Sequence, residues 1–178
     1  DPDPLAAAVL VELAGADGLV VHLREDRRHI QDRDLHLLRE ISRTKLDLEM
    51  AADVDMAKIA LNIKPDLVTL VPEKRQELTT EGGLDIVGER ERIQHIVNVL
   101  RNGGIPVCVF IDPDLNQIKA AHKIAVDFVE LHTGRYANAT RSKEADTEFE
   151  AISLAAKLAY KLGIGVNAGH GLNYRNIK

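Results

Sequence analysis

The stretch Leu-Val-Val-His-Leu-Arg at residues 19–24 shares its pattern with Leu-Asp-Leu-Glu-Met at 46–50 and Phe-Val-Glu-Leu-His at 128–132. Side chains on a β-strand alternate between its two faces, so each stretch has aliphatic residues on one face and ionisable residues on the other. If the aliphatic faces pack against helices, the ionisable faces meet in a common interior. The pattern therefore predicts a parallel sheet with a polar inner face. Barrel enzymes have their catalytic residues at one end of such a sheet.

Strand and helix patterns alternate along the whole chain. Further strands are predicted at residues 67–71, 107–111 and 164–168. Helices are predicted at residues 4–14, from 32 or 34 to 41, at 57–63, at 93–100, after 112–114 and at 149–161. About six strands with helices between them indicate one parallel α/β domain over residues 1–178.

Two topologies fit this alternation. A doubly wound open sheet suits the length, but its central strands are apolar on both faces. An eight-stranded (β/α)8 TIM barrel carries its polar active-site residues at the carboxyl ends of its strands and typically has about 250 residues. The alternating polar positions favour the barrel, so we expect a chain truncated at both ends, without roughly the first and the last strand.

The composition narrows the class of protein. The chain has 178 residues, a net charge of −5 and 3% aromatic residues, which argues against a nucleic-acid partner. No apolar run approaches the ~20 residues of a membrane span. The only cysteine, Cys108, lies in the apolar stretch 107–111, so we expect a buried thiol, no internal disulfide and a reducing, cytoplasmic setting.

Four segments are specific enough to indicate a family. They are Val-His-Leu-Arg-Glu-Asp-Arg-Arg-His-Ile-Gln-Asp-Arg-Asp (21–34), Leu-Val-Pro-Glu-Lys-Arg-Gln-Glu-Leu-Thr-Thr-Glu-Gly-Gly-Leu-Asp (70–85), Glu-Leu-His-Thr-Gly-Arg-Tyr-Ala (130–137) and Asn-Ala-Gly-His-Gly-Leu-Asn-Tyr (167–174). With these segments the chain resembles the pyridoxine 5′-phosphate synthase family, the ring-closing enzymes of the deoxyxylulose-dependent vitamin B6 pathway. The resemblance extends over essentially the whole chain.

The resemblance implies a (β/α)8 barrel that assembles into a homo-octamer in the bacterial cytoplasm and uses no metal or other cofactor. It implies that two small phosphorylated substrates, 1-deoxy-D-xylulose 5-phosphate and 3-amino-2-oxopropyl phosphate, condense to pyridoxine 5′-phosphate, inorganic phosphate and water. Two parts of the family pattern have no counterpart in residues 1–178: the Asn-x-Asp-His strand with the arginine after it, and the Gly-His phosphate-binding turn after the last strand. We therefore expect part of the active site to be missing.

The resemblance also implies roles for eight residues. His22 and Glu49 become proton acceptors, His170 a proton donor, Glu130 a transition-state stabiliser, Arg24, His29 and Thr79 contacts to deoxyxylulose phosphate, and Gly171 a backbone contact to the other phosphate. Arg175 stands where the family pattern has a histidine, which leaves its role open. These residue types suit the reaction, because a condensation with ring closure needs proton transfers at several atoms.

Several other interpretations rest on the residues alone. Asp112 and Asp114 are predicted to cap a helix, and residues 73–88 to form a lid over the substrates. His132 shares a face with Glu130, and its contact with substrate stays open. His36, His95 and His122 lie in helical patterns and are predicted to be exposed surface residues.

Two other functions remain as alternatives. A divalent-metal hydrolase or epimerase could use the two histidines and two glutamates of the site as ligands. The sequence has no His-x-His pair and no His-Glu-x-x-His helix, which argues against a metal enzyme. The truncated chain could also be an inactive phosphate-binding module.

Overall fold

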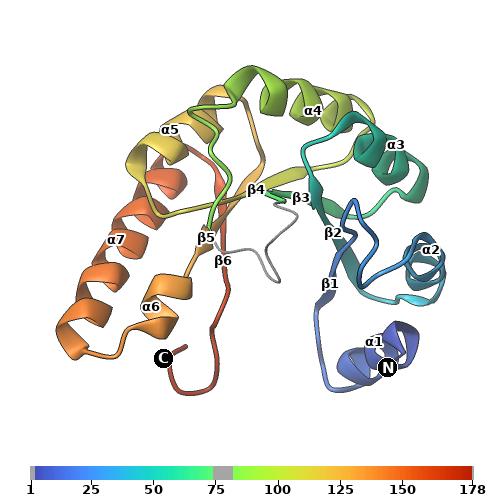
Figure 1. The fold of residues 1–178 in the computed structure, drawn as a ribbon, viewed down its shortest axis with the longest axis horizontal. Helices are drawn as coiled ribbons and strands as arrows, with labels where there is room; N and C mark the ends of the chain where they lie inside the picture. Colours follow the sequence, from blue (N-terminus) through green and yellow to red (C-terminus); the bar gives the residue numbers. More distant parts are fainter. Residues whose placement is uncertain (1–2, 74–81, 178) are drawn as a thin grey trace.

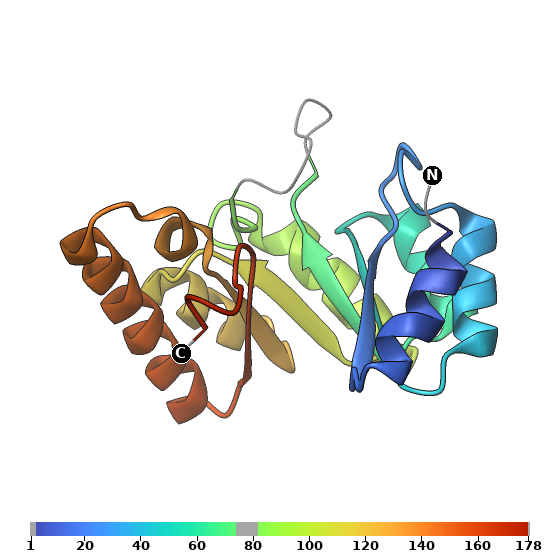
Figure 2. The ribbon, with the colours of Figure 1, turned by 90° about the horizontal axis from the view of Figure 1, so that it is seen from below.

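A computed structural model describes residues 3–73 and 82–177. In this part of the chain six parallel strands form one sheet in the order β1-β2-β3-β4-β5-β6. The sheet curls, and the helices lie along its outer, convex side (Figure 1). Seen from below, β1 and β6 are the two edges of the curled sheet (Figure 2).

The elements follow one another in the predicted order, and besides shifts of up to three residues at their ends there are two larger differences. The structure has α1 (Pro4–Leu13), β1 (Gly18–His22), α2 (Asp32–Ile41), β2 (Lys45–Ala51), α3 (Val54–Ile63), β3 (Leu67–Val71), α4 (Arg90–Asn102), β4 (Val107–Ile111), α5 (Leu115–Lys123), β5 (Phe128–His132), α6 (Gly134–Asn138), α7 (Ser142–Lys161) and β6 (Gly165–Gly169). The short helix α6 was not predicted. Helix α7 begins at Ser142 rather than at Phe149, because its polar first two turns carry no apolar stripe.

The outer face of the sheet forms the core. Leu46, Leu48 and Met50 of β2 and Val129 and Leu131 of β5 are each fully buried. Aliphatic side chains at alternate positions pack against the covering helices, as the alternation predicted. The remaining side chains of these strands therefore point to the inner, concave face.

The strand register aligns the polar residues of that inner face. His22 pairs with Glu49, and Glu49 pairs with Thr69. In the other half of the sheet, along β4, β5 and β6, Phe110 pairs with Glu130 and Glu130 pairs with Asn167. Paired residues on parallel strands point to the same face, so the register brings the polar groups into rows across the sheet.

One predicted helix cap is confirmed and the other is wrong. Asp114 caps α5, because its side chain accepts hydrogen bonds from the backbone N–H groups of Asn116 and Gln117. Asp112 does not cap the helix; it accepts from His132 and from the Gly83 backbone. The difference is physical: Asp112 directly follows β4, so its side chain faces the end of the neighbouring strand.

The described residues form an open curl of six parallel strands, which is consistent with the expected (β/α)8 barrel without roughly its first and last strands. Within residues 3–73 and 82–177, no helix combines the length and the apolar character needed to cross a bilayer.

Candidate active site

The polar inner face carries two clusters of mainly ionisable side chains at the carboxyl ends of the strands. The first, here called the His22 cluster, consists of His22, Glu49 and Glu73 on the β1–β3 side. The second, the His170 cluster, consists of Phe110, Glu130, His132 and His170 on the β4–β6 side. The sheet thus brings together the four predicted catalytic residues, although 148 positions separate the first from the last (His22 to His170).

In the His22 cluster one imidazole lies between two carboxylates. His22 Nε2 is 3.0 Å from Glu73 Oε1, and His22 Nδ1 is 3.7 Å from Glu49 Oε2. The second oxygen of Glu73 accepts a hydrogen bond of 3.0 Å from the Glu25 backbone N–H. Both nitrogens of the ring therefore face a carboxylate, which orients the ring.

The two carboxyl groups of this cluster differ in their pKa. Burial raises the pKa of Glu49, and the neighbouring His22 opposes that rise. Burial also acts to raise the pKa of Glu73, but hydrogen bonds from His22 and the Glu25 backbone hold it below its ordinary value. Glu73 is therefore the ionised partner of His22, while Glu49 takes up a proton more readily.

Glu73 is a site residue that sequence reasoning missed. The sequence pattern predicts Glu73 at the start of a lid, and residues 74–81 of that predicted lid lie outside the described residues. Its contact with His22 joins positions 51 residues apart, which no local pattern reveals. One signal was available: Glu73 follows β3 by two residues, at the same edge of the sheet where the other site residues lie.

The His170 cluster is less charged and more aromatic. His170 Nδ1 is 3.9 Å from Glu130 Oε1. The ring centroid of His170 is 4.4 Å from that of Phe110 and 5.2 Å from that of His132. Burial, with smaller effects from Glu49 and Asp47, raises the pKa of Glu130 to about 7. A carboxyl group with this pKa exists in both protonated and ionised forms at neutral pH.

The backbone of His170 is strained. Its φ of +78° lies in the left-handed region, which costs a residue with a side chain about 1–3 kcal/mol. The Thr133 hydroxyl donates to the carbonyl oxygens of both Gly169 and His170, at 2.6 and 2.7 Å. Such strain persists only where the surroundings hold it, and it is concentrated at functional sites.

A lower layer of the inner face lies beneath both clusters. Burial raises the pKa of Asp47 to about 6, although the Thr69 hydroxyl donates to its carboxylate at 2.9–3.0 Å and opposes that rise. Cys108 is fully buried, as predicted, and burial raises the pKa of its thiol.

The predicted substrate contacts are placed differently from one another. Arg24 is only 4% exposed and lines a cavity of about 230 Å³ together with Glu73. His29 is exposed, so the structure does not bring it into either cluster. Gly171 directly follows His170, and its φ of +78° suits glycine. Thr79 lies outside the described residues.

The remaining histidines and Arg175 lie apart from the clusters. His36, His95 and His122 are exposed, as predicted, and Arg175 is exposed too. Within residues 3–73 and 82–177, no group of three or more His, Cys, Asp or Glu side chains is arranged to hold a metal ion.

A parallel α/β sheet that gathers imidazoles and carboxylates at the carboxyl ends of its strands defines an enzyme of acid–base chemistry. The family described as "Pyridoxal phosphate biosynthesis protein PdxJ" matches residues 1–178. The chain belongs to this family and is an enzyme of pyridoxine biosynthesis.

Curated relatives with high sequence identity support this family membership. The chain is 60% identical to pyridoxine 5′-phosphate synthase of Geobacter metallireducens over 178 residues, which is all of this chain and 74% of the relative. It is 58% identical to the enzyme of that name from a Synechococcus strain over 177 residues, 99% of this chain and 74% of the relative.

Solved structures support the fold alone. A mandelate oxidase superposes with a TM-score of 0.62 at 14% identity, over 91% of this chain and 56% of the other. An HpcH/HpaI aldolase/citrate lyase family protein from Burkholderia cenocepacia gives a TM-score of 0.57 at 15% identity, over 92% and 75%.

Proposed function

We propose that the protein is a pyridoxine 5′-phosphate synthase that condenses 1-deoxy-D-xylulose 5-phosphate with 3-amino-2-oxopropyl phosphate. The products are pyridoxine 5′-phosphate, inorganic phosphate and water. The observation that carries the proposal is the meeting of His22, Glu49, Glu130 and His170 on one inner face. Membership of the family and identities near 60% to relatives of that name support it.

The two clusters suit the proton transfers of this reaction. Joining an amine to a ketone, expelling phosphate and aromatising the ring all move protons at different atoms, which one acid–base group cannot reach. In the proposal His22 and Glu49 accept protons, and His170 donates one. Glu130, with a pKa of about 7 beside His170, stabilises charge that develops in the transition state.

The phosphate groups of the substrates need cationic and backbone donors. Arg24 supplies a guanidinium beside the His22 cluster, which suits bidentate binding of phosphate oxygens. Gly171 supplies a backbone N–H with no side chain in the way. In the proposal His29 and Thr79 complete the contacts to deoxyxylulose phosphate. Arg24 and Gly171 lie beside different clusters, so the two phosphates would bind on opposite sides of the inner face.

The proposal extends to the assembly. An eight-stranded (β/α)8 barrel would close the six-stranded curl, and the relatives are longer than this chain, which covers 74% of their length. We place the active protein in a cytoplasmic homo-octamer without metal or other cofactor. Light scattering of the purified protein tests the octamer, and metal analysis of active fractions tests the metal-free reaction.

The deciding experiment mixes the purified protein with both phosphates and follows inorganic phosphate together with the absorbance of the aromatic product. We expect both signals to rise in equal amounts. Binding of deoxyxylulose phosphate without phosphate release would instead support a phosphate-binding module. In a His170→Asn variant we expect the reaction to stop at an early intermediate, and an unchanged rate would remove the role of His170.

A further inference from the structure

Two residues at the end of β5 hold His170 in place. Thr133 fixes the strained backbone through its hydroxyl, and its own backbone N–H donates to the Gly169 carbonyl at 2.8 Å. His132 contacts the ring: the two imidazoles meet edge to face, with an interplanar angle of 83°. Backbone and side chain of His170 are thus both held by the segment 132–133.

His132 is itself held by a hydrogen bond to Asp112. His132 Nδ1 is 3.0 Å from Asp112 Oδ1, and the imidazole side chain is only 9% exposed. The hydrogen bond from His132 is the main reason why the pKa of Asp112 lies below its ordinary value. An ionised carboxylate only accepts hydrogen bonds, so Nδ1 of His132 is the donor in this pair.

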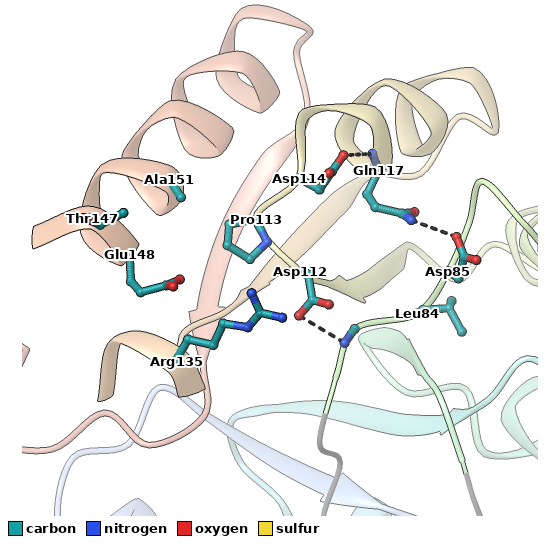
Figure 3. A pocket seen from close by; sticks show the side chains of 11 residues that line it. Leu84, Asp85, Asp112, Pro113, Asp114, Gln117, Arg135, Thr147, Glu148 and Ala151 are labelled. Atoms are coloured by element: carbon teal, nitrogen blue, oxygen red, sulfur yellow. Dashed lines mark hydrogen bonds between the residues drawn. The ribbon is translucent and has the colours of Figure 1, made fainter. Parts of the chain in front are cut away.

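Asp112 is fixed in turn by its surroundings. Its Oδ1 accepts from the Gly83 backbone N–H at 3.3 Å. Asp112 lines a cavity of about 550 Å³ together with Arg135, whose guanidinium points toward the carboxylate (Figure 3). Asp112 is 43% exposed while His132 is buried, so the pair spans the wall between this cavity and the inner face.

The ring of His132 has no room to turn. A Cβ placed on Gly134 would lie 2.6 Å from His132 Nε2, so the backbone at the start of α6 closes on the imidazole. On another side the Phe110 ring packs edge to face at 5.0 Å between centroids. The carboxylate, the aromatic ring and the glycine backbone together define one orientation for His132.

We propose that the Asp112–His132 pair is a positioning device for His170, which fixes its ring and sets how readily it takes up a proton. Asp112 holds His132 Nδ1 as a hydrogen-bond donor and fixes the plane of the ring, and the His132 ring contacts that of His170. Among the described residues, the charged and titratable groups that face His170 are Glu130 and His132 from β5 and His22 from β1. Burial, followed by His132 and His22, lowers the pKa of His170.

The value of this device for the reaction rests on the proposed function, in which His170 donates a proton. A donor works only while protonated, so its activity is lost as the pH rises through its pKa. In His132→Gln the neutral amide replaces an imidazole that opposes protonation of His170. We therefore expect the alkaline limb of the pH–rate profile to move to higher pH.

The decisive test is an NMR titration of the His170 ring in the purified protein without substrate, with its signal assigned by its loss in His170→Asn. We expect a higher midpoint in His132→Gln than in the unchanged protein. His122→Gln, which removes an exposed imidazole from α5, is the matched control and leaves the midpoint unchanged. An identical midpoint in His132→Gln and in the control would overturn the proposal.

Gly134→Ala keeps every titratable group but pushes the His132 ring away, so it repeats the test if His132→Gln does not fold. Asp112→Asn replaces the carboxylate that accepts from His132 Nδ1, so the 15N shift of Nδ1 should change. We expect kcat in His132→Gln to fall on the order of tenfold, less than the about 10²–10⁴-fold of a general acid. A moved midpoint with unchanged kcat would keep the positioning and remove His170 from the proposed reaction.

Discussion

The His22 cluster and the His170 cluster lie on the same inner face, but they are built on different principles. In the first, an imidazole sits between two carboxylates at 3.0 and 3.7 Å. In the second, the imidazole has one carboxylate at 3.9 Å and two aromatic rings, and burial lowers its pKa. Charge is compensated in the first cluster and suppressed in the second, which lets one sheet hold groups of opposite acid–base tendency.

The largest expected effect comes from breaking both clusters. We expect Glu49→Gln and Glu130→Gln each to reduce kcat by about 10²–10⁴-fold, because each removes one titratable carboxyl group. If the clusters act in the same reaction, the double variant should be little slower than the slower single variant. Phosphate release measures the rates, and the exposed Glu150→Gln is the control. Strictly multiplicative losses would show that the clusters act independently.

The next prediction concerns the free energy of unfolding and tests whether charge is suppressed near His170. The Glu130 pKa rises from 4.5 to about 7, so the folded chain binds this proton more tightly than the unfolded chain. The cost of burying the charge is absent below about pH 4.5, grows as the pH rises to 7 and is then constant. The full cost of burying the charged carboxylate is about 3 kcal/mol.

Glu130→Gln should therefore stabilise the protein at pH 8 by up to that amount and leave its stability at pH 4 nearly unchanged. Urea unfolding at the two pH values measures the difference. The same gain at both pH values would mean that packing, and not the buried charge, is responsible.

A smaller effect tests the space around Glu130. A Cβ on Gly169 would lie 2.0 Å from Glu130 Oε1, so Gly169→Ala must displace the carboxylate. We expect a loss of about 1–3 kcal/mol in unfolding free energy together with a loss of activity. Gly82→Ala is the matched control, since a Cβ there meets nothing within 4 Å. Equal effects of the two alanines would contradict the crowding.

The smallest effect concerns the layer beneath the clusters. Thr69→Val removes the hydroxyl that donates to Asp47, whose pKa is already raised to about 6 by burial. We expect a destabilisation of about 1–2 kcal/mol above pH 6, where the carboxylate is charged, and a smaller one below pH 4. The difference between thermal unfolding curves at the two pH values is the measurement, and a pH-independent loss would argue for packing alone.

The sequence predicted the six strands and most of the helices, because alternation in strands and apolar spacing in helices are local patterns. It also placed Glu130 and His132 on one face, since both lie in the same strand. The short helix α6 escaped prediction because five residues carry too little periodicity.

The contacts between strands could not be predicted from local patterns. Asp112 has the position and residue type of a helix cap, and only the neighbouring strand end supplies His132 as its partner. Glu73 reaches His22 across β2, and the strained backbone of His170 is held by Thr133, which follows β5. These features depend on the curl of the sheet, which the order of residues alone does not give.

The burial of Cys108 has a practical consequence. A thiol with no exposed surface and a raised pKa forms little thiolate, so alkylating reagents should leave it untouched in the folded protein. A cysteine introduced at an exposed position such as Glu150 would then be the sole reactive thiol of this chain. Fluorescent dyes or spin labels could be attached there without first replacing the native residue.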